Sequence, residues 1–196
     1  MKKGLLMAVA AGCLCATQAS AKIWHPYVGV DYVYNDAKYD SPYDKQLAEK
    51  FNSFSGSVGI KVTTNLAVEA FYQQSMDENR TGYSTYLIND GVDSSVKIKG
   101  YGVDLVSDMI NLDKIEVLTS LGIAQYTADV NRNYYYGGKM MNIKDTYDGT
   151  GVRFGLGAQV NITDSIGVRA MARYVLTDVE ALKDMKEVTV GLRYTF

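Results

Sequence analysis

The sequence predicts an all-β protein, an eight-stranded antiparallel up-and-down transmembrane β-barrel. Three observations predict it: eight segments in which apolar residues alternate with other residues, connections that alternate between long and short, and a minority face of small and charged residues. Alternation with period two is typical of strands that have two different faces.

The composition excludes several other classes of protein. Apolar residues make up 47% of the 196 residues, yet the mean hydropathy is only −0.12, so helical spans of about 20 apolar residues are not expected. Aromatic residues at 11% and charges of both signs argue against disorder. A formal charge of −2 and a pI of about 5.4 exclude nucleic acid as a partner.

The first segment predicts a secretory signal peptide over residues 1–21. A basic start precedes a short apolar stretch, and a small-residue Ala-Ser-Ala site follows it. We place cleavage after Ala21, which leaves residues 22–196 as the barrel domain and removes both cysteines. A lipoprotein signal modified at Cys13 is the alternative, but Ala10 stands where Leu is usual.

The eight predicted strands are about ten residues long. In the first, Val28, Val30 and Tyr32 lie on one face, Gly29 and Asp31 lie on the other, and Val33 breaks the pattern. The segments are 24–34, 54–62, 66–76, 99–106, 115–124, 152–160, 166–176 and 187–196.

The predicted connections are long on one side of the sheet and short on the other. Long ones cover 35–53, 77–95 and 127–148, an intermediate one covers 178–186, and short turns lie near 64–65, 107–113 and 161–165. Connections that are long on one side and short on the other are typical of a barrel that spans an outer membrane. A short helix over Lys45–Phe51 is a further expectation within the first long loop.

The minority face carries many small residues and nine charges. An interior of eight strands is just wide enough for side chains to fill, and buried charges must pair there. Five basic and four acidic residues nearly balance, which favours a charge-paired, closed lumen over an open pore. These are Asp31, Lys61, Glu69, Asp104, Glu116, Arg153, Arg169, Arg173 and Arg193.

The last predicted strand has the most specific motif. Apolar residues occupy every second position up to the final residue: Val188, Val190, Leu192, Tyr194 and Phe196. This motif resembles the C-terminal assembly signal of bacterial outer-membrane barrels, which the barrel-assembly machinery recognises.

In size, strand number and loop rhythm, the chain resembles the small outer-membrane barrels of the OmpA/OmpX and opacity-protein type. The resemblance implies a monomer in the outer membrane of a Gram-negative bacterium, with both termini in the periplasm. It also implies contact with outer-membrane lipid and lipopolysaccharide, and loops that form a surface antigen or adhesive element.

No residue set predicts a cofactor, a metal site or catalysis. The only histidine, His25, precedes Pro26 at the start of the first strand, on the side predicted to be periplasmic. Barrel enzymes that modify lipids generally place a histidine with a serine or an acid near the outer leaflet, so an enzyme is not expected. Glycine pairs from Gly149 to Gly157 lack the third glycine of a dinucleotide fingerprint and predict strand glycines facing the lumen.

The most distinctive loop segment contains Tyr134, Tyr135 and Tyr136. Exposed tyrosines are typical of recognition surfaces, so this run is a candidate contact with a host or cell-surface ligand. The alternative is that the flanking strands extend above the membrane and these tyrosines pack on their neighbours. A structural or adhesive surface role is the main functional prediction. A narrow porin-like channel, a lipid-modifying enzyme and a soluble lipocalin-shaped barrel are the other hypotheses.

Overall fold

The computed structural model describes residues 25–39, 49–76, 78–83, 91–112, 114–136, 139–179 and 182–196. The predicted signal peptide lies outside these residues. The strands are β1 (His25–Tyr39), β2 (Lys50–Lys61), β3 (Leu66–Ser75), β4 (Glu78–Tyr83), β5 (Gly91–Leu112), β6 (Ile115–Tyr136), β7 (Lys139–Asn161), β8 (Ile166–Thr177) and β9 (Leu182–Thr195).

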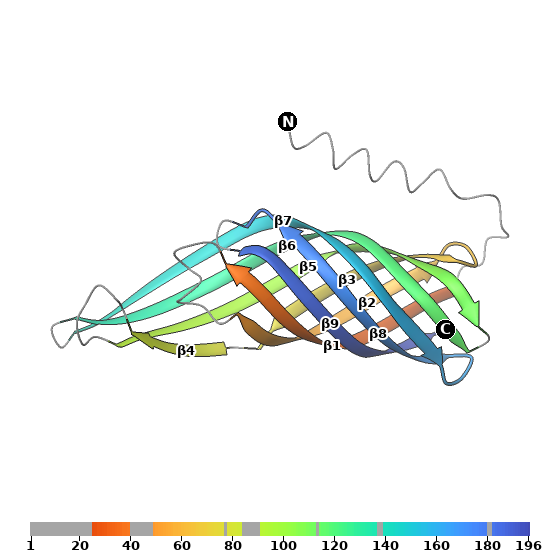
Figure 1. Cartoon of the computed structure of the whole chain (residues 1–196), viewed down its shortest axis with the longest axis horizontal. Coiled ribbons are helices and arrows are strands. Elements are labelled where there is room, and N and C mark those ends of the chain that lie inside the picture. The colour runs from red at the N-terminus through yellow and green to blue at the C-terminus, as the bar shows by residue number, and fades with distance from the viewer. Residues whose placement is uncertain are drawn as a thin grey trace, which may run out of the picture.

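The strands form one closed antiparallel wall. β1 pairs with β2 on one side and with β9 on the other, from Tyr27 opposite Thr195 to Tyr39 opposite Leu182. β3 and β4 lie one after the other along β5, so together they form one position in the wall (Figure 1). The predicted eight-stranded up-and-down barrel is therefore confirmed.

Two short turns at the end of the barrel that bears the C-terminus share one construction. Val62 donates a backbone hydrogen bond to the Leu66 carbonyl at 2.9 Å, and Ile162 donates to the Ile166 carbonyl at 2.8 Å. A threonine follows each donor, and the Thr163 hydroxyl accepts from the Ile166 amide at 3.0 Å. Such side-chain bonds to nearby backbone explain why these short polar segments turn tightly.

At the other end, the strands are longer than the alternation of apolar residues predicts. The predicted long loop 127–148 is wrong, because β6 runs to Tyr136 and β7 begins at Lys139. The loops 35–53 and 77–95 are also shortened by β1, β2, β4 and β5. Apolar residues stop alternating where the outward face becomes polar, although the strands themselves continue.

The predicted helix over Lys45–Phe51 is wrong at its end, since Lys50 and Phe51 belong to β2. Residues 45–48 lie outside the described residues. No helix in the described part of the chain is long and apolar enough to cross a membrane.

Side chains alternate between a packed interior and an exposed exterior. In β1, Val30 is 64% exposed, whereas Val33, the exception in the sequence pattern, is fully buried inside. Exterior aromatic residues lie opposite each other across strands, as Tyr72 does with Tyr101 and Phe154 with Tyr174. An apolar exterior with aromatic residues suits contact with lipid.

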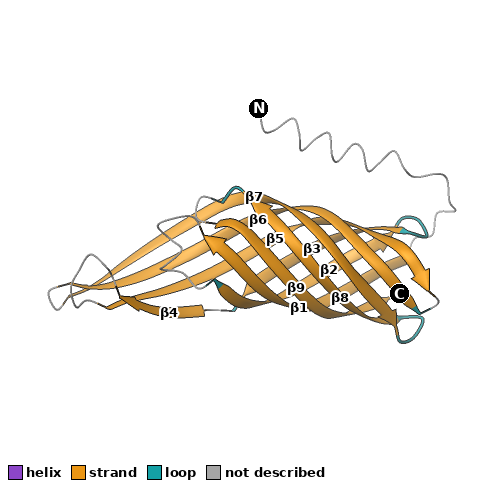
Figure 2. Ribbon diagram, viewed as in Figure 1, coloured by secondary structure: helices purple, strands orange, loops and turns teal. Residues whose placement is uncertain are grey.

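β4, β5, β6 and β7 continue as a sheet beyond the rest of the wall (Figure 2). We call this part, residues 78–83, 91–99, 127–136 and 139–149, the extension. Among the described residues, β7 pairs with β8 only from Gly151 onward, so the described part of β7 in the extension pairs with β6 alone. Its base coincides with a change of the outward face from Tyr101 and Ile123 to the polar Lys99 and Gln125.

Candidate functional site

The barrel interior holds all nine charged residues that the alternation assigns to it. Eight of them are buried, and Lys61 is partly buried near one end. Burying a charge is costly unless it is paired and hydrogen-bonded, so their partners decide what the interior can do.

Arg169 is the centre of one cluster. Its guanidinium contacts the Asp31 carboxylate at 2.6 Å and the Glu69 carboxylate at 2.8 Å. The Tyr27 hydroxyl donates to the same Glu69 carboxylate at 3.0 Å. β1, β3 and β8, which are distant in the sequence, therefore meet across the lumen through one arginine.

Glycines make room for these pairs on the intervening strand. Gly191 of β9 lies between Asp31 and Arg169 in the register. A Cβ atom there would collide with the Asp31 carboxylate and the Val30 carbonyl. Gly122 of β6 lies in the same way between Asp104 and Arg153.

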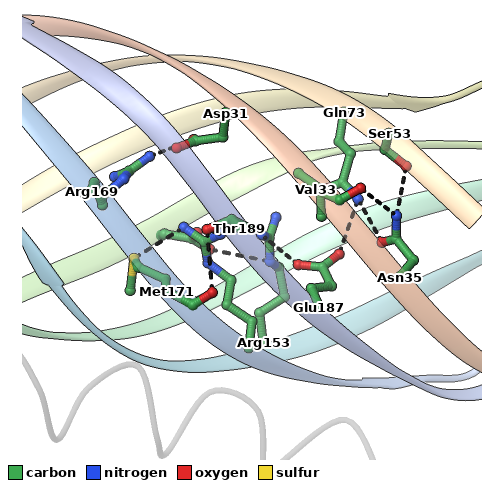
Figure 3. A network of polar contacts seen from close by, with 12 residues as sticks. Asp31, Val33, Asn35, Ser53, Gln73, Arg153, Arg169, Met171, Glu187 and Thr189 are labelled. Carbon is green, nitrogen blue, oxygen red and sulfur yellow. Dashed lines mark hydrogen bonds and ion pairs between the residues drawn. The ribbon is translucent and has the colours of Figure 1, made fainter.

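A second cluster surrounds Arg153. Its guanidinium contacts Glu187 at 3.1 Å (Figure 3). It also lies 3.8 Å from Asp104 and 3.8 Å above the Phe71 ring. Arg173 lies 3.9 Å from Asp104. Both Asp104 oxygens are buried without a hydrogen-bond partner among the described residues.

Neutral side chains connect this cluster to the wall. Gln73 donates to Glu187 at 3.1 Å and to Asn35 at 3.2 Å, and Asn35 donates to the Ser53 hydroxyl at 2.8 Å. Figure 3 shows these residues pointing toward one another from β1, β2, β3 and β9.

A third cluster lies at the end that bears the C-terminus. Lys61 contacts Asp108 at 3.0 Å and Glu116 at 3.7 Å. Gln159 donates to Glu116 and accepts from Arg193, whose guanidinium lies 3.3 Å above the Tyr27 ring. The nine predicted charges thus fall into three clusters, one around Arg169, one around Arg153 and one at the end that bears the C-terminus.

Sequence reasoning missed Glu187, Asp108, Tyr27 and Gln73 as members of these clusters. Glu187 occupies the inward face of the last predicted strand, so alternation was a signal that could have found it. Asp108 falls in a segment predicted as a turn, and only the longer β5 places it inside.

An apolar cluster fills the interior at the base of the extension and continues onto the inward face of the extension. It contains Ala37, Tyr39, Phe51, Phe71, Val96, Ile98, Ala124, Tyr126, Ala128, Val130, Val175, Val179, Leu182 and Met185. Tyr126 is 1% exposed and Met185 is fully buried. The lumen therefore has two layers, a charged one and an apolar one, and the apolar layer was not predicted.

The outward face of the extension is polar. Three rows of residues cross β5, β6 and β7, and each row lies above the last apolar positions of the wall. The rows are Lys99–Thr127–Asp148, Lys97–Asp129–Thr146 and Ser95–Asn131–Lys144. A cleft of about 490 Å³ lies among the last two rows, with Asp145 also in its lining.

Hydrogen bonds tie the rows together. Lys99 contacts Asp129 at 3.0 Å, and the Thr146 hydroxyl donates to the same carboxylate at 3.0 Å. Partial desolvation raises the pKa of the Asp129 carboxyl, but the bonds from Lys99 and Thr146 outweigh it and hold this pKa below its usual range. The hydrogen bond to Asp129 raises the pKa of Lys99.

The three candidate contact tyrosines lie at the tip of β6. Tyr134, Tyr135 and Tyr136 pair with Met141, Met140 and Lys139 of β7. The two strands therefore extend through this segment, as one of the two interpretations expected. The side chains of these tyrosines lie outside the described residues.

The five residues of the C-terminal motif face outward along β9 and at the residue that follows it. Val188, Val190, Leu192, Tyr194 and Phe196 are each at least 44% exposed on the lipid-facing surface. Tyr194 and Phe196 pack edge to face, with ring centroids 5.1 Å apart.

His25 lies at the start of β1, opposite Lys61 and at the far end from the extension. It lines an open pocket of about 740 Å³ together with Lys114, Glu116 and the terminal Phe196. Within the described residues, no group of three or more His, Cys, Asp or Glu side chains could hold a metal ion.

Solved structures resemble this barrel over most of its length. The attachment invasion locus protein Ail of Yersinia pestis has 15% identity and a TM-score of 0.57, over 88% of this chain and 99% of that chain. Neisserial surface protein A has 18% identity and a TM-score of 0.56, over 87% and 97%. OprG from Pseudomonas aeruginosa has 9% identity and a TM-score of 0.59, over 90% and 98%. Such low identities show a common fold alone.

No curated protein sequence matches the chain significantly. The sequence profile described as "Outer membrane protein beta-barrel domain" matches residues 6–196, which is nearly the whole chain. The chain therefore belongs to the outer membrane protein β-barrel family, and its place is the bacterial outer membrane.

Proposed function

We propose that this protein is a closed, non-catalytic barrel that presents the extension as a recognition surface outside the cell. The extension itself carries this proposal. A wall that only crossed the membrane would end near Tyr101 and Ile123, whereas β6 continues for 13 residues after Ile123 with a polar outward face.

The closed lumen is the first part of the proposal. Salt-bridged clusters fill one layer of the interior, and the apolar cluster that contains Tyr126 fills the next. An ion would have to leave water and displace packed side chains to pass, which is costly. We expect planar-bilayer recordings to show no discrete conductance steps. Regular steps would favour the narrow-channel hypothesis instead.

The recognition surface is the second part. Lys97, Asn131, Lys144 and Thr146 line the outward cleft of the extension and can donate hydrogen bonds to a polar ligand. One structure of Ail contains the heparin analogue sucrose octasulfate, so a sulfated saccharide is a sensible first probe. The tyrosines at the tip of β6 would add aromatic contact area.

A lipid-modifying enzyme is disfavoured by the position of His25. That side chain lies at the end of the barrel opposite to the extension. The enzyme hypothesis requires a histidine near the outer leaflet, at the other end. We therefore assign recognition, and not catalysis, to the extracellular side.

Two sets of substitutions test this role. In the first, Tyr134, Tyr135 and Tyr136 are all replaced by serine, and in the second, Lys97→Gln is combined with Lys144→Gln. We expect each set to reduce adhesion of expressing cells to immobilised heparin or to epithelial cells. The matched control is Lys114→Gln, a lysine of the same type at the opposite end. Unchanged adhesion in both sets, with the barrel folded, would refute the recognition role.

A further inference from the structure

An apolar groove lies on the lipid-facing surface of the wall, where β1, β2 and β3 run side by side. It has a volume of about 410 Å³, and its outward-facing lining residues are Val28, Gly56, Val58, Ala70 and Tyr72. Val28 pairs with Val58, and Val58 pairs with Ala70, so the lining is continuous across the strands. Because the chain is an outer-membrane barrel, this groove opens toward hydrocarbon.

Gly56 makes the groove deep. A Cβ atom at Gly56 would meet nothing within 4 Å, whereas a Cβ atom at the nearby Gly59 would collide with the Tyr27 ring. Packing inside the barrel therefore does not require glycine at position 56. The pairing of β2 with β1 and β3 continues through Gly56 without a shift of register, so Gly56 marks no bulge. A glycine within a strand that marks no bulge or bend is typical of a place where a ligand approaches the backbone.

The groove lies at the upper limit of the apolar surface, on the side of the extension. The outward face changes from Tyr72 to Gln74 on β3, and from Tyr101 to Lys99 on β5. Gln74 pairs with Lys99 in the register, and the Tyr72 hydroxyl donates to the Gln74 side-chain oxygen at 3.0 Å. A polar row thus begins directly beyond the groove.

This polar row lies at the level of lipid headgroups. Strands of such barrels tilt by about 35–45°, so two residues along a strand span about 5 Å of membrane depth. Gln74 is therefore about 5 Å above Tyr72, whose ring stands at the rim where aromatic residues meet headgroups. A lipid whose headgroup contacts Gln74 and Lys99 has its acyl chains beside Tyr72 and the groove.

Lys99 gives this row a positive charge for a headgroup. Its ammonium group contacts Asp129 at 3.0 Å, yet the side chain remains 39% exposed. An ammonium group has more than one N–H donor, so Lys99 can also donate to a phosphate oxygen. Lipid tails are as apolar as the groove, so burial alone selects no lipid. Selection has to come from the shape of the groove together with this polar contact.

We propose that the groove is a lipid-binding site, which holds one acyl chain of a phosphate-bearing lipid while Lys99 and Gln74 bind the headgroup phosphate. The lipid belongs to the leaflet on the side of the extension. The site lies on the lipid-facing wall, so the proposal goes beyond the recognition role of the extension and does not depend on it.

Lipid retention tests the proposal. The purified protein in detergent micelles is mixed with phosphatidic acid, and the fraction of barrels that retain one lipid is measured by native mass spectrometry. Diacylglycerol with the same acyl chains is the second probe, because it differs only in lacking the phosphate. The wild-type protein should bind phosphatidic acid saturably, and it should bind diacylglycerol more weakly.

One pair of variants tests the groove. Gly56→Leu fills the groove, and saturable binding of phosphatidic acid is lost. Ala172→Leu adds the same bulk at an exposed alanine of β8, outside the groove, and keeps binding. Folding of each variant is checked by its heat-dependent migration on a denaturing gel.

A second pair of variants tests the headgroup contact. Lys99→Gln should weaken binding of phosphatidic acid roughly fivefold, as expected for one lysine near a charged membrane surface, and should leave diacylglycerol binding unchanged. Lys186→Gln is the matched control, since Lys186 is exposed just beyond the lipid-facing Val188 of β9 but has no such groove beside it. It should bind both probes like the wild type.

Equal retention of phosphatidic acid by the wild type and a folded Gly56→Leu variant would overturn the site, because the lipid would then coat the wall without selection. Unchanged binding by Lys99→Gln would overturn the headgroup contact. A wild-type dimer that excludes lipid and that Gly56→Leu abolishes would make a second copy the occupant instead. Failure of the recognition role is seen separately, as unchanged heparin and cell adhesion in the Lys97, Lys144 and tyrosine variants, whatever Gly56→Leu does to lipid retention.

Discussion

Arg169 and Asp31 form a 2.6 Å ion pair across β9, the strand that lies between their own strands in the wall. Gly191 is the residue over which they meet, because it has no side chain to separate them. Glu69 and Tyr27 meet in the same way over Gly59 of β2. Gly191, Gly122 and Gly59 therefore serve the charge clusters as well as relieving crowding in a narrow barrel.

Gly191→Ala is expected to destabilise the barrel by about 1–3 kcal/mol, the usual range for overpacking a filled interior. The added Cβ would collide with the Asp31 carboxylate and with backbone atoms of β1. The free energy of unfolding in lipid vesicles, measured by urea titration, checks this. Gly56→Ala is the control, since a Cβ at that exterior position meets nothing within 4 Å. Equal effects of the two variants would contradict the argument.

Arg169→Met is expected to cost about 3–5 kcal/mol, because it leaves the Asp31 and Glu69 carboxylates buried without their cation. Adding Asp31→Asn and Glu69→Gln to the same chain should recover most of this loss, since no buried charge then lacks a partner. Urea unfolding of the single and triple variants measures both effects. A triple variant less stable than Arg169→Met would show that these residues act by some means other than pairing.

Asp129 should show a depressed pKa in a nuclear magnetic resonance titration of the folded protein. The unfolded carboxyl titrates near 3.8, so the stability that this group contributes is fully present above that pH. It is lost as the pH falls through the lower pKa of the folded state. Lys99→Met removes one hydrogen bond and should raise the Asp129 pKa, while Lys114→Met should not. An Asp129 pKa that is indifferent to Lys99 would contradict the contact.

Phe196→Ser should reduce the amount of barrel inserted in the outer membrane, as the resemblance of the C-terminal motif to an assembly signal predicts. The fraction with heat-dependent migration in isolated outer membranes measures insertion. Ile162→Ser is the control, because Ile162 is 60% exposed at the same end of the barrel but lies outside the motif. Equal insertion of both variants and the wild type would remove the assembly role from Phe196.

The alternation of the sequence was sufficient to predict the wall, because lipid on one side and a packed interior on the other fix which face each residue takes. Asp31, Arg153 and Arg169 were placed inside by that rule alone. The partners could not be predicted in the same way. Arg169 meets Glu69 across 100 positions of sequence, and only the shear of the closed barrel brings them to one level.

The extension was missed for a related reason. Above the lipid, the outward face of β6 becomes polar at Gln125, Thr127 and Asp129, so apolar alternation fades although strand pairing continues. The inward residues Ala128 and Val130 still follow period two. A search for alternation on the inward face alone would have extended β6 correctly.

The pairing of β1 with β9 has a consequence for how the protein folds. Tyr27 pairs with Thr195, so the wall closes between residues near the two ends of the described chain. This is a contact of very high sequence separation, and its loop-closure entropy must be overcome before the contact stabilises anything. Until β9 arrives, both β1 and β8 carry exposed edges in a chain rich in β-forming residues. Closure is therefore the step at which folding competes with aggregation, and a chaperone that shields those edges would act there.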